Sequence, residues 1–260
     1  LSLSSGCSCP NRDGTLGTRG CLFCDGAGAF AETGDIPAQL RRAKARLHGK
    51  EGEGRYIAYF QSFTNTYAPA EYLRPLFEAA MEPEEVVALS VATRPDCLPP
   101  EILDLLAELN RRKPVWVELG LQTIHPESAA YLRRGYELPV FEEAVRALRA
   151  RGIEVIVHLI LGIPGETQED MIASARYVGQ WADGVKLHLL HVLDGTDLAA
   201  EYAAGRVRPL EREEYFGLLE DCLRVLPSSV VIHRLTGDGD KRRLLAPLWS
   251  ADKKAVLNAM

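Results

Sequence analysis

The 260-residue sequence lacks the marks of several common protein classes. No apolar run approaches the roughly 20 residues that a membrane-spanning helix needs, and no signal peptide is visible, so we expect no membrane segment. Net positive charge is also lacking, because the formal charge is −6. That balance argues against a globally basic nucleic-acid-binding protein, although a local basic patch stays open. No Gly/Ser-rich linker or low-complexity segment marks an independent second domain.

Cysteine is scarce outside one loop. Four of the six cysteines, Cys7, Cys9, Cys21 and Cys24, lie within eighteen positions that are rich in Gly, Asn, Asp and Pro. With 47% apolar residues, the chain can build a core without disulfide bonds. The clustered cysteines therefore indicate metal chemistry in a reducing compartment, and we expect a cytoplasmic protein.

The four clustered thiols allow three interpretations. They are unpaired structural thiols, a zinc site that uses all four cysteines, or an iron–sulfur cluster held by only three of them. The Cys21-x-x-Cys24 half has the spacing of a zinc knuckle, and a closed tetrahedron of thiolates suits zinc. Spacing alone does not separate zinc from iron–sulfur.

Short apolar strands alternate with amphipathic helices over most of the chain. The expected strands are residues 1–4, 56–60, 86–91, 115–119, 154–161 and 185–190, and the expected helices are 36–48, 69–81, 99–109, 140–149 and 169–181. Strands that are apolar almost throughout belong to a parallel sheet covered by helices. The sequence therefore predicts an α/β fold, a partial (β/α)6 TIM-like barrel.

Polar or Gly-rich segments follow nearly every expected strand. They are the cysteine loop, QSFTNT, TRPD, GLQT, GIPGET and the histidines of HLLH. Loops are often polar, which explains one or two such segments but explains six less well. Because sites in parallel α/β folds form at the carboxyl ends of the strands, we expect these segments to face one mouth.

The last quarter of the sequence has a different pattern. Residues 213–226 read as a helix and 230–235 as a strand, and TGDGDKRRLLAPLWS looks like an irregular extension with an apolar anchor. We therefore expect a barrel core over residues 1–194 and a C-terminal α/β extension over 195–260 that packs on the barrel.

Eight segments together resemble one protein family. In order, they are CPNRDGTLGTRGCLFC, YFQSFTNTYA, TRPDCLP, ELGLQT, RRGY, HLILGIPGET, DGVKLHLLHVLDGT and HRLTGD. They resemble the YhcC-like branch of the radical S-adenosylmethionine (SAM) superfamily and cover essentially the whole chain. The resemblance implies a partial barrel of the radical SAM type that binds a 4Fe–4S cluster and SAM.

The resemblance also implies the cluster ligands, which are Cys9, Cys21 and Cys24. Their spacing departs from the common Cys-x3-Cys-x2-Cys pattern but is similar to the longer loop of the YhcC-like branch. Cys7 is not required by that pattern. The open iron of such a cluster chelates SAM, whose reductive cleavage yields a 5′-deoxyadenosyl radical that abstracts a hydrogen atom from the substrate.

SAM contacts implied by the resemblance fall on several strand ends. Phe23 would pack near the adenine. Gln61 and Ser62 stand where the superfamily usually has a Gly-Gly-Glu-like segment that holds the methionine amino group. Glu118 and Gln122 are candidates for ribose hydroxyls, and an ion-paired strand residue is the alternative for Glu118.

Further contacts are implied downstream. Arg134 has the spacing of an arginine that pairs with the SAM carboxylate in oxygen-independent coproporphyrinogen oxidase, a bidentate contact that suits Arg. His158 takes the position of a ribose-binding polar residue, and Ile163 and Gly165 would let backbone groups approach the adenine. Arg94 and Asp96 serve function or form an internal salt bridge.

Lys186 and His188 leave the last core strand toward the mouth and are the candidates for catalytic, substrate-side groups. Several motifs are also similar to the radical SAM domain of the Elongator catalytic subunit, which modifies the wobble uridine of tRNA. The resemblance therefore favours radical chemistry on RNA, in the first instance on a tRNA base, with an electron donor of the flavodoxin or ferredoxin type. Two alternatives stay open: the same chemistry on a small metabolite or a protein side chain, and a non-enzymatic zinc-stabilised binding module. Basic residues that could meet phosphates are Arg41, Arg42, Lys44, Arg46 and residues 241–243.

Overall fold

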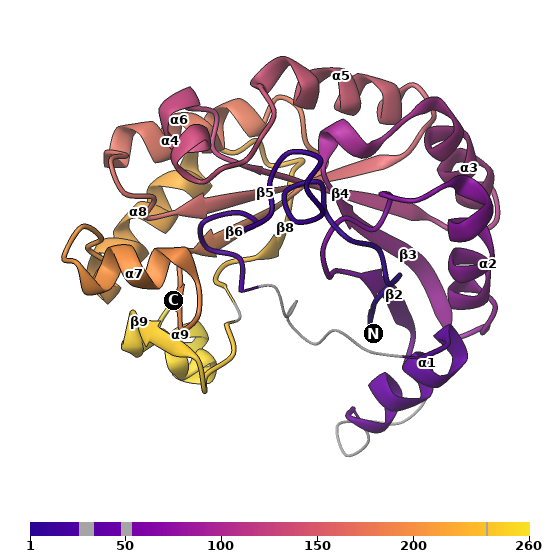
Figure 1. The fold of residues 1–260 in the computed structure, drawn as a ribbon, viewed down its shortest axis with the longest axis horizontal. Coiled ribbons are helices and arrows are strands. Elements are labelled where there is room, and N and C mark those ends of the chain that lie inside the picture. Colours follow the sequence, from indigo (N-terminus) through magenta and orange to yellow (C-terminus); the bar gives the residue numbers. More distant parts are fainter. Residues whose placement is uncertain (26–33, 48–53, 238) are drawn as a thin grey trace.

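A seven-stranded parallel sheet organises the chain. The computed structural model describes residues 1–25, 34–47, 54–237 and 239–260, and within these ranges the strand order is β1-β2-β3-β4-β5-β6-β8 (Figure 1). The strands are β1 (Ser2–Leu3), β2 (Tyr56–Phe60), β3 (Val86–Thr93), β4 (Val115–Gln122), β5 (Glu154–Leu161), β6 (Gly184–Leu189) and β8 (Val231–Arg234). The sheet curls into a half-barrel with β1 and β8 at its two edges, which confirms the predicted α/β partial barrel.

Helices form an arc along the outside of the sheet (Figure 1). They are α1 (Ile36–Ala45), α2 (Ala70–Met81), α3 (Pro100–Asn110), α4 (Pro126–Tyr131), α5 (Leu138–Arg149), α6 (Gln168–Val178), α7 (Asp197–Ala203), α8 (Arg212–Val225) and α9 (Lys253–Ala259). Side-chain caps explain where some of them begin. Asp35 accepts a hydrogen bond from the Ala38 amide at α1, and Thr167 forms a capping box with Asp170 at α6.

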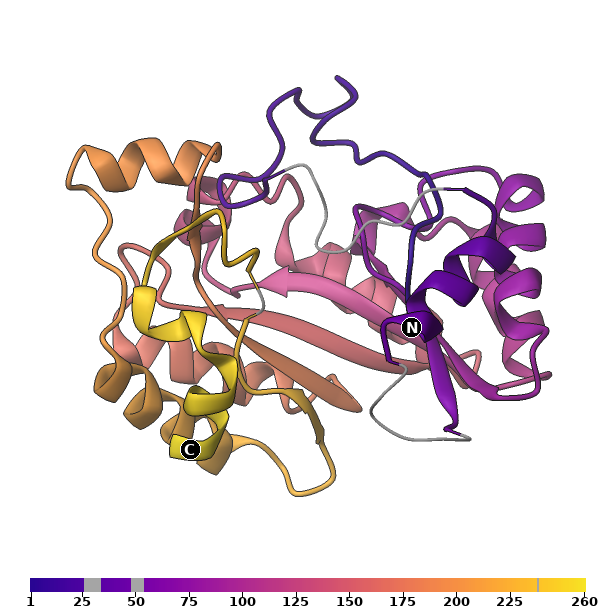
Figure 2. The ribbon, with the colours of Figure 1, turned by 90° about the horizontal axis from the view of Figure 1, so that it is seen from below.

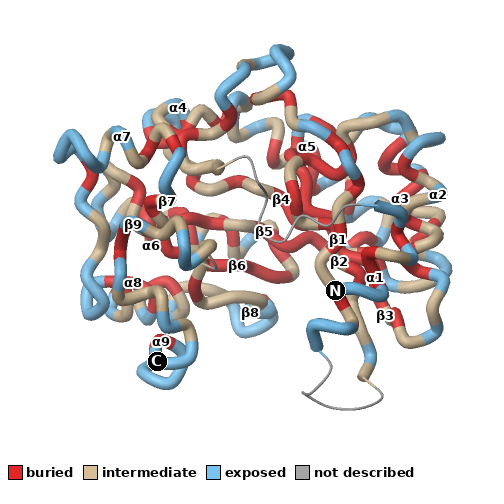
Figure 3. The backbone as a smooth tube through the Cα atoms, turned by 60° about the horizontal axis from the view of Figure 1, so that its bottom comes forward, coloured by how far each residue is buried: buried red, intermediate tan, exposed pale blue. Residues whose placement is uncertain are grey.

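The main core lies between these helices and the sheet. Phe60 of β2 meets Phe77 of α2 edge to face at 5.0 Å, and both are fully buried. Figure 3 shows buried residues along the central strands, where β3 and β6 are buried on both faces over most of their length. Burial on both faces is expected for a covered parallel sheet. None of the helices in the described ranges is long and apolar enough to cross a bilayer.

Several boundaries differ from the predicted ones. β3 and β4 continue to Thr93 and Gln122, because pairing with neighbouring strands carries them past the polar and glycine residues that suggested an end. The short helices α4 and α7 were not predicted, since six or seven residues carry little periodicity. α1 ends at Ala45, before the predicted residue 48, which lies outside the described residues.

The C-terminal extension is more regular than its sequence suggests. β8 joins the main sheet in parallel beside β6. β9 (Leu244–Ala246) pairs antiparallel with β7 (Val192–Leu193), which follows β6 directly. The stretch read as irregular therefore contributes a second, two-stranded sheet. Figure 2 shows this segment (yellow) near one edge of the main sheet, and its Arg243 reaches the end of the cysteine loop (indigo) by pairing with Asp25 at 2.9 Å.

Candidate active site

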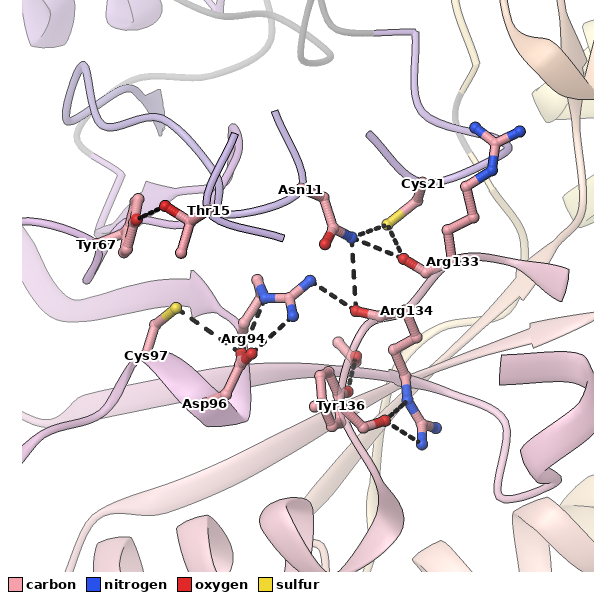
Figure 4. Close-up of polar contacts among 11 residues, drawn as sticks. Asn11, Thr15, Cys21, Tyr67, Arg94, Asp96, Cys97, Arg133, Arg134 and Tyr136 are labelled. Carbon is pink, nitrogen blue, oxygen red and sulfur yellow. Dashed lines mark hydrogen bonds and ion pairs between the residues drawn. The ribbon is translucent and has the colours of Figure 1, made fainter. Parts of the chain in front are cut away.

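The cysteine loop follows β1 and is held against the mouth of the half-barrel by the buried side chain of Asn11. Its Nδ2 donates to the Arg133 carbonyl at 2.7 Å and to Cys21 Sγ at 3.2 Å (Figure 4). Gly20 lies against the Arg12 guanidinium, where a Cβ would come within 2.7 Å of Nη2. Arg12 in turn donates to the Cys24 carbonyl at 2.8 Å. Polar contacts therefore hold most of this loop, and Leu22 anchors its end in a small apolar cluster with Leu132 and Ile163.

A second anchor ties the start of the loop to the strands. Asn65, which is fully buried, accepts a hydrogen bond from Ser5 Oγ at 2.7 Å. Its Nδ2 donates to the carbonyls of Phe60 and Ala92 at 3.0 and 2.9 Å. The loop is thus fixed to the carboxyl ends of β2 and β3, as the strand-end argument predicted.

Cys9, Cys21 and Cys24 line one cavity of about 250 Å³ at this mouth. Most of the residues that the resemblance assigned to SAM line the same cavity. These are Phe23, Gln61, Glu118, Gln122, Arg134 and His158. Segments separated by more than a hundred residues thus meet around one space, and the predicted ligands and the predicted SAM contacts share it.

Burial, with smaller contributions from the neighbouring Cys24 and Cys9, raises the pKa of the Cys21 thiol to about 11. In the described part of the chain, no three Cys, His, Asp or Glu side chains stand close enough together to hold a single metal ion. Cys7 packs in the main hydrophobic core and is not among the residues that line the cavity. The zinc interpretation needs all four thiols at one point, whereas three cysteines facing one space fit a cluster with three thiolate ligands.

Glu118 is the centre of a buried polar network. Its carboxylate accepts hydrogen bonds from Ser90 Oγ at 2.6 Å, from His158 Nε2 at 2.6 Å and from the Lys186 ammonium. Burial alone would raise the pKa of this carboxyl, but His158 and Lys186 outweigh burial and lower it. Glu118 is therefore an ion-paired residue, one of the two roles considered for it, and it also forms part of the cavity wall.

The network also orients His158. Burial lowers the pKa of this histidine, so its ring is neutral. Because Nε2 donates its proton to the Glu118 carboxylate, Nδ1 is left as a hydrogen-bond acceptor. An acceptor at this wall suits a hydroxyl group, as the predicted ribose contact requires.

Two arginines stack on Tyr136 behind the cavity. Arg134 lies 4.5 Å from the ring centroid and donates four hydrogen bonds to the carbonyls of Leu121, Thr123 and Tyr136. A guanidinium has five N–H donors, so at most one is left for an incoming carboxylate. The pairing of Arg134 with the SAM carboxylate stays a prediction, and the structure adds a second task, tying β4 to the segment before α5.

Arg94 forms a bidentate salt bridge with Asp96, at 2.9 and 2.7 Å (Figure 4). Its third contact is to the Arg134 carbonyl at 2.7 Å. Of the two roles considered for Arg94 and Asp96, the internal salt bridge is the one that the structure contains.

A second cavity, of about 300 Å³, adjoins the first. Ser62 and His188 line only this second cavity, together with Tyr59 and Arg234. The residues that line both cavities are Phe23, Cys24, Gln61, Phe63, Gln122 and His158. The half-barrel therefore offers two contiguous spaces that share one wall.

Three predicted residues lie away from these walls. Lys186 is not among the residues that line either cavity; its ammonium lies 4.2 Å from the Tyr59 ring and pairs with Glu118. Ile163 is buried in a small apolar cluster against which Phe23 packs, and Gly165 lines neither cavity. Their predicted roles are not tested by this arrangement.

Comparison with known proteins gives the family. The family model described as "Radical SAM superfamily" matches residues 14–178, and the one described as "Radical_SAM C-terminal domain" matches residues 182–260. The chain belongs to the radical SAM superfamily. Membership implies a 4Fe–4S cluster and SAM, and it makes this protein an enzyme instead of a zinc-stabilised binding module.

Relatives place this radical SAM enzyme in the predicted branch. YtqA of Bacillus subtilis is 44% identical over 100% of this chain and 82% of that protein, and YhcC of Escherichia coli is 38% identical over 97% and 82%. A tRNA uridine(34) acetyltransferase of Dehalococcoides mccartyi is 30% identical over 58% of this chain and 33% of that protein. The solved structure of Methanocaldococcus infernus Elp3 has a TM-score of 0.70 at 20% identity, covering 87% of this chain and 58% of the other.

Sequence reasoning missed two residues of this radical SAM enzyme. Asn11 stands in the CPNRDG segment and Arg234 in HRLTGD, so both lay inside motifs that carried the resemblance. Their roles depend on contacts across the fold, between Asn11 and Arg133 or between β8 and the second cavity. Only the motif position could have drawn attention to them.

Replacing Asn11 with leucine is expected to destabilise the folded chain by about 1–3 kcal/mol, since the partly buried Arg133 carbonyl would lose the hydrogen bond that the buried Asn11 side chain donates. Denaturant unfolding of the cluster-free protein measures the change. Asn258→Leu serves as a control, because it makes the same substitution at an exposed position of α9. An equal loss in both variants would contradict a special role for Asn11 in holding the loop.

Proposed function

We propose that Cys9, Cys21 and Cys24 hold the 4Fe–4S cluster, that the first cavity binds SAM and that the second cavity receives the substrate. The observation that carries this proposal is the pair of contiguous cavities with a shared wall of Phe23, Gln61, Gln122 and His158. A radical formed in one space and a hydrogen donor held in the other would meet at that wall. When bound, the cluster and SAM supply the 5′-deoxyadenosyl radical that abstracts the substrate hydrogen.

The chain's own residues would orient these groups. His158, held by the Glu118–Lys186 pair, presents Nδ1 as an acceptor to a ribose hydroxyl. Gln122 has a φ of 71° beside a register shift between β4 and β5, a local irregularity that re-aims a side chain at the strand end. The proposed cluster needs reduced thiols, which a cytoplasmic location would supply, and an external donor of the flavodoxin or ferredoxin type.

The proposed substrate is a nucleobase of RNA, in the first instance a tRNA uridine. Support comes from the 30% identity with the tRNA uridine(34) acetyltransferase of Dehalococcoides mccartyi. The match covers only 33% of that relative, so the proposal extends to the target base and not to acetyl transfer.

A small metabolite or a protein side chain is the second candidate substrate. One observation favours it: several basic residues considered for phosphate contacts already pair with acids. Lys44 pairs with Glu85, Arg242 with Asp240, and Arg243 with Asp25. Paired side chains bring less net positive charge to a polyanion.

The reconstituted and reduced protein is expected to form 5′-deoxyadenosine from SAM under anaerobic conditions. Addition of bulk tRNA is expected to increase that product and to change the mass of one nucleoside after digestion, both measured by mass spectrometry. A matched incubation without SAM is the control. Formation of 5′-deoxyadenosine with no change in any nucleoside would reject the RNA substrate in favour of the second candidate.

A further inference from the structure

Arg234 is a cation that the proposed function does not use. It lies on β8, in register with Lys186 of β6, and it lines the second cavity beside Tyr59 and His188. Residues in register on neighbouring strands share a face of the sheet, so Arg234 belongs to the inner face that carries Lys186. Throughout the described ranges, no hydrogen bond or ion pair of the Arg234 side chain occurs, whereas Arg243 nearby in sequence pairs with Asp25.

The charges around the second cavity do not cancel. Lys186 is neutralised by Glu118, and the Asp25 carboxylate on the cavity wall is neutralised by Arg243 at 2.9 Å. Burial lowers the pKa of His188, so this histidine adds no charge. The guanidinium of Arg234 is therefore an uncompensated positive charge among the described residues that line this cavity.

Two buried polar atoms of the same cavity also have no hydrogen-bond partner in the described structure. They are Ser62 Oγ and His188 Nε2. Ser62 is only 3% exposed. Leaving a buried polar group unpaired is unfavourable, and a ligand that forms hydrogen bonds with both atoms would recover that cost. Both atoms can donate a hydrogen bond, Ser62 through its hydroxyl and His188 through an Nε2–H tautomer.

We propose that the second cavity is an oxyanion subsite, in which Arg234 pairs with a phosphate or carboxylate of the substrate and Ser62 and His188 donate hydrogen bonds to it. A guanidinium matches both groups because it forms two parallel N–H···O bonds with either. The subsite narrows the substrate to a molecule with such a group close to the reacting carbon. That this oxyanion belongs to the substrate rests on the proposed function, whereas the binding of an oxyanion by Arg234 does not.

Titration calorimetry of the full chain with inorganic phosphate and with acetate tests the subsite. At least one of the two oxyanions is expected to bind, and Arg234→Gln is expected to weaken that binding by about 10-fold or more, because a charge-assisted hydrogen bond is lost. Phosphate binding alone indicates a nucleotide substrate, and acetate binding alone a carboxylate metabolite. Arg176→Gln, at an exposed position of α6, is the matched control and is expected to leave binding unchanged.

Arg234→Lys is a second variant, for the case that Arg234→Gln does not fold. Lysine keeps the positive charge but loses the bidentate contact, so this variant is expected to lose less oxyanion affinity than the glutamine variant. Ser62→Ala is expected to weaken the binding of the same oxyanion several-fold. Absence of oxyanion binding by the natural chain, or equal binding by the natural chain and Arg234→Gln, would overturn the proposal. The proposal would also be overturned if Arg234→Gln weakened the binding of SAM but not of either oxyanion, since Arg234 would then hold the SAM carboxylate.

The binding test separates the subsite from the proposed function. Oxyanion binding that depends on Arg234, in a protein that forms no 5′-deoxyadenosine, would retain the subsite and reject the proposed reaction. Formation of 5′-deoxyadenosine without any oxyanion binding would retain the proposed reaction and reject the subsite.

Discussion

Cys21→Ala is expected to remove the cluster and with it the formation of 5′-deoxyadenosine. Cys21 faces the first cavity with Cys9 and Cys24, and its sulfur is positioned by Asn11 at 3.2 Å. Changes in residues that only support metal ligands already cost about 10–100-fold, so loss of a ligand is expected to lower the rate by more than about 100-fold. Iron and sulfide analysis after anaerobic reconstitution measures the cluster independently of activity.

Cys7→Ala is the matched control for this variant. Cys7 comes from the same loop but packs in the main hydrophobic core and lines neither of the two adjoining cavities. It is expected to retain iron, sulfide and turnover. Unchanged iron content in Cys21→Ala would contradict the proposed ligand set. Loss of iron in Cys7→Ala would instead indicate a metal site that includes Cys7.

Lys186→Met is expected to lower the free energy of unfolding by about 3–5 kcal/mol, because it leaves the Glu118 carboxylate without its cation in a buried position. Glu118 and Lys186 are 3% and 6% exposed, and methionine fills a similar volume. Denaturant unfolding of the cluster-free chain measures the loss. Lys241→Met, at an exposed position, is the control and is expected to change stability by less than about 0.5 kcal/mol.

The double variant Lys186→Met, Glu118→Gln sharpens this test. If the cost comes from an uncompensated charge, removing that charge is expected to recover part of the stability lost in Lys186→Met. A double variant that is less stable than Lys186→Met would show that packing, and not the buried carboxylate, dominates. A loss in Lys186→Met no larger than in the control would show that His158 and Ser90 satisfy Glu118 by themselves.

Local pattern predicted the elements well where burial is continuous. The strands at residues 56–60 and 154–161 were predicted with the bounds that β2 and β5 have. Prediction was poorer where tertiary pairing extends a strand, as at Gln122, and where an element is too short for periodicity, as in α4 and α7. It was poorest in the C-terminal extension, because the pairing of β9 with β7 joins segments about fifty residues apart.

The sequence by itself determined the fold class, because strand and helix periodicity is local. Through the resemblance of its motifs, it also indicated the family and the three candidate ligands. Only the tertiary structure decided that Glu118 pairs with Lys186 and that Arg134 binds backbone carbonyls. It also decided that Arg234 lines the second cavity with no side-chain partner among the described residues. The physical reason is strand register. A side chain's neighbours in a parallel sheet come from strands far away in sequence, and the spacing of motifs along one chain does not specify them.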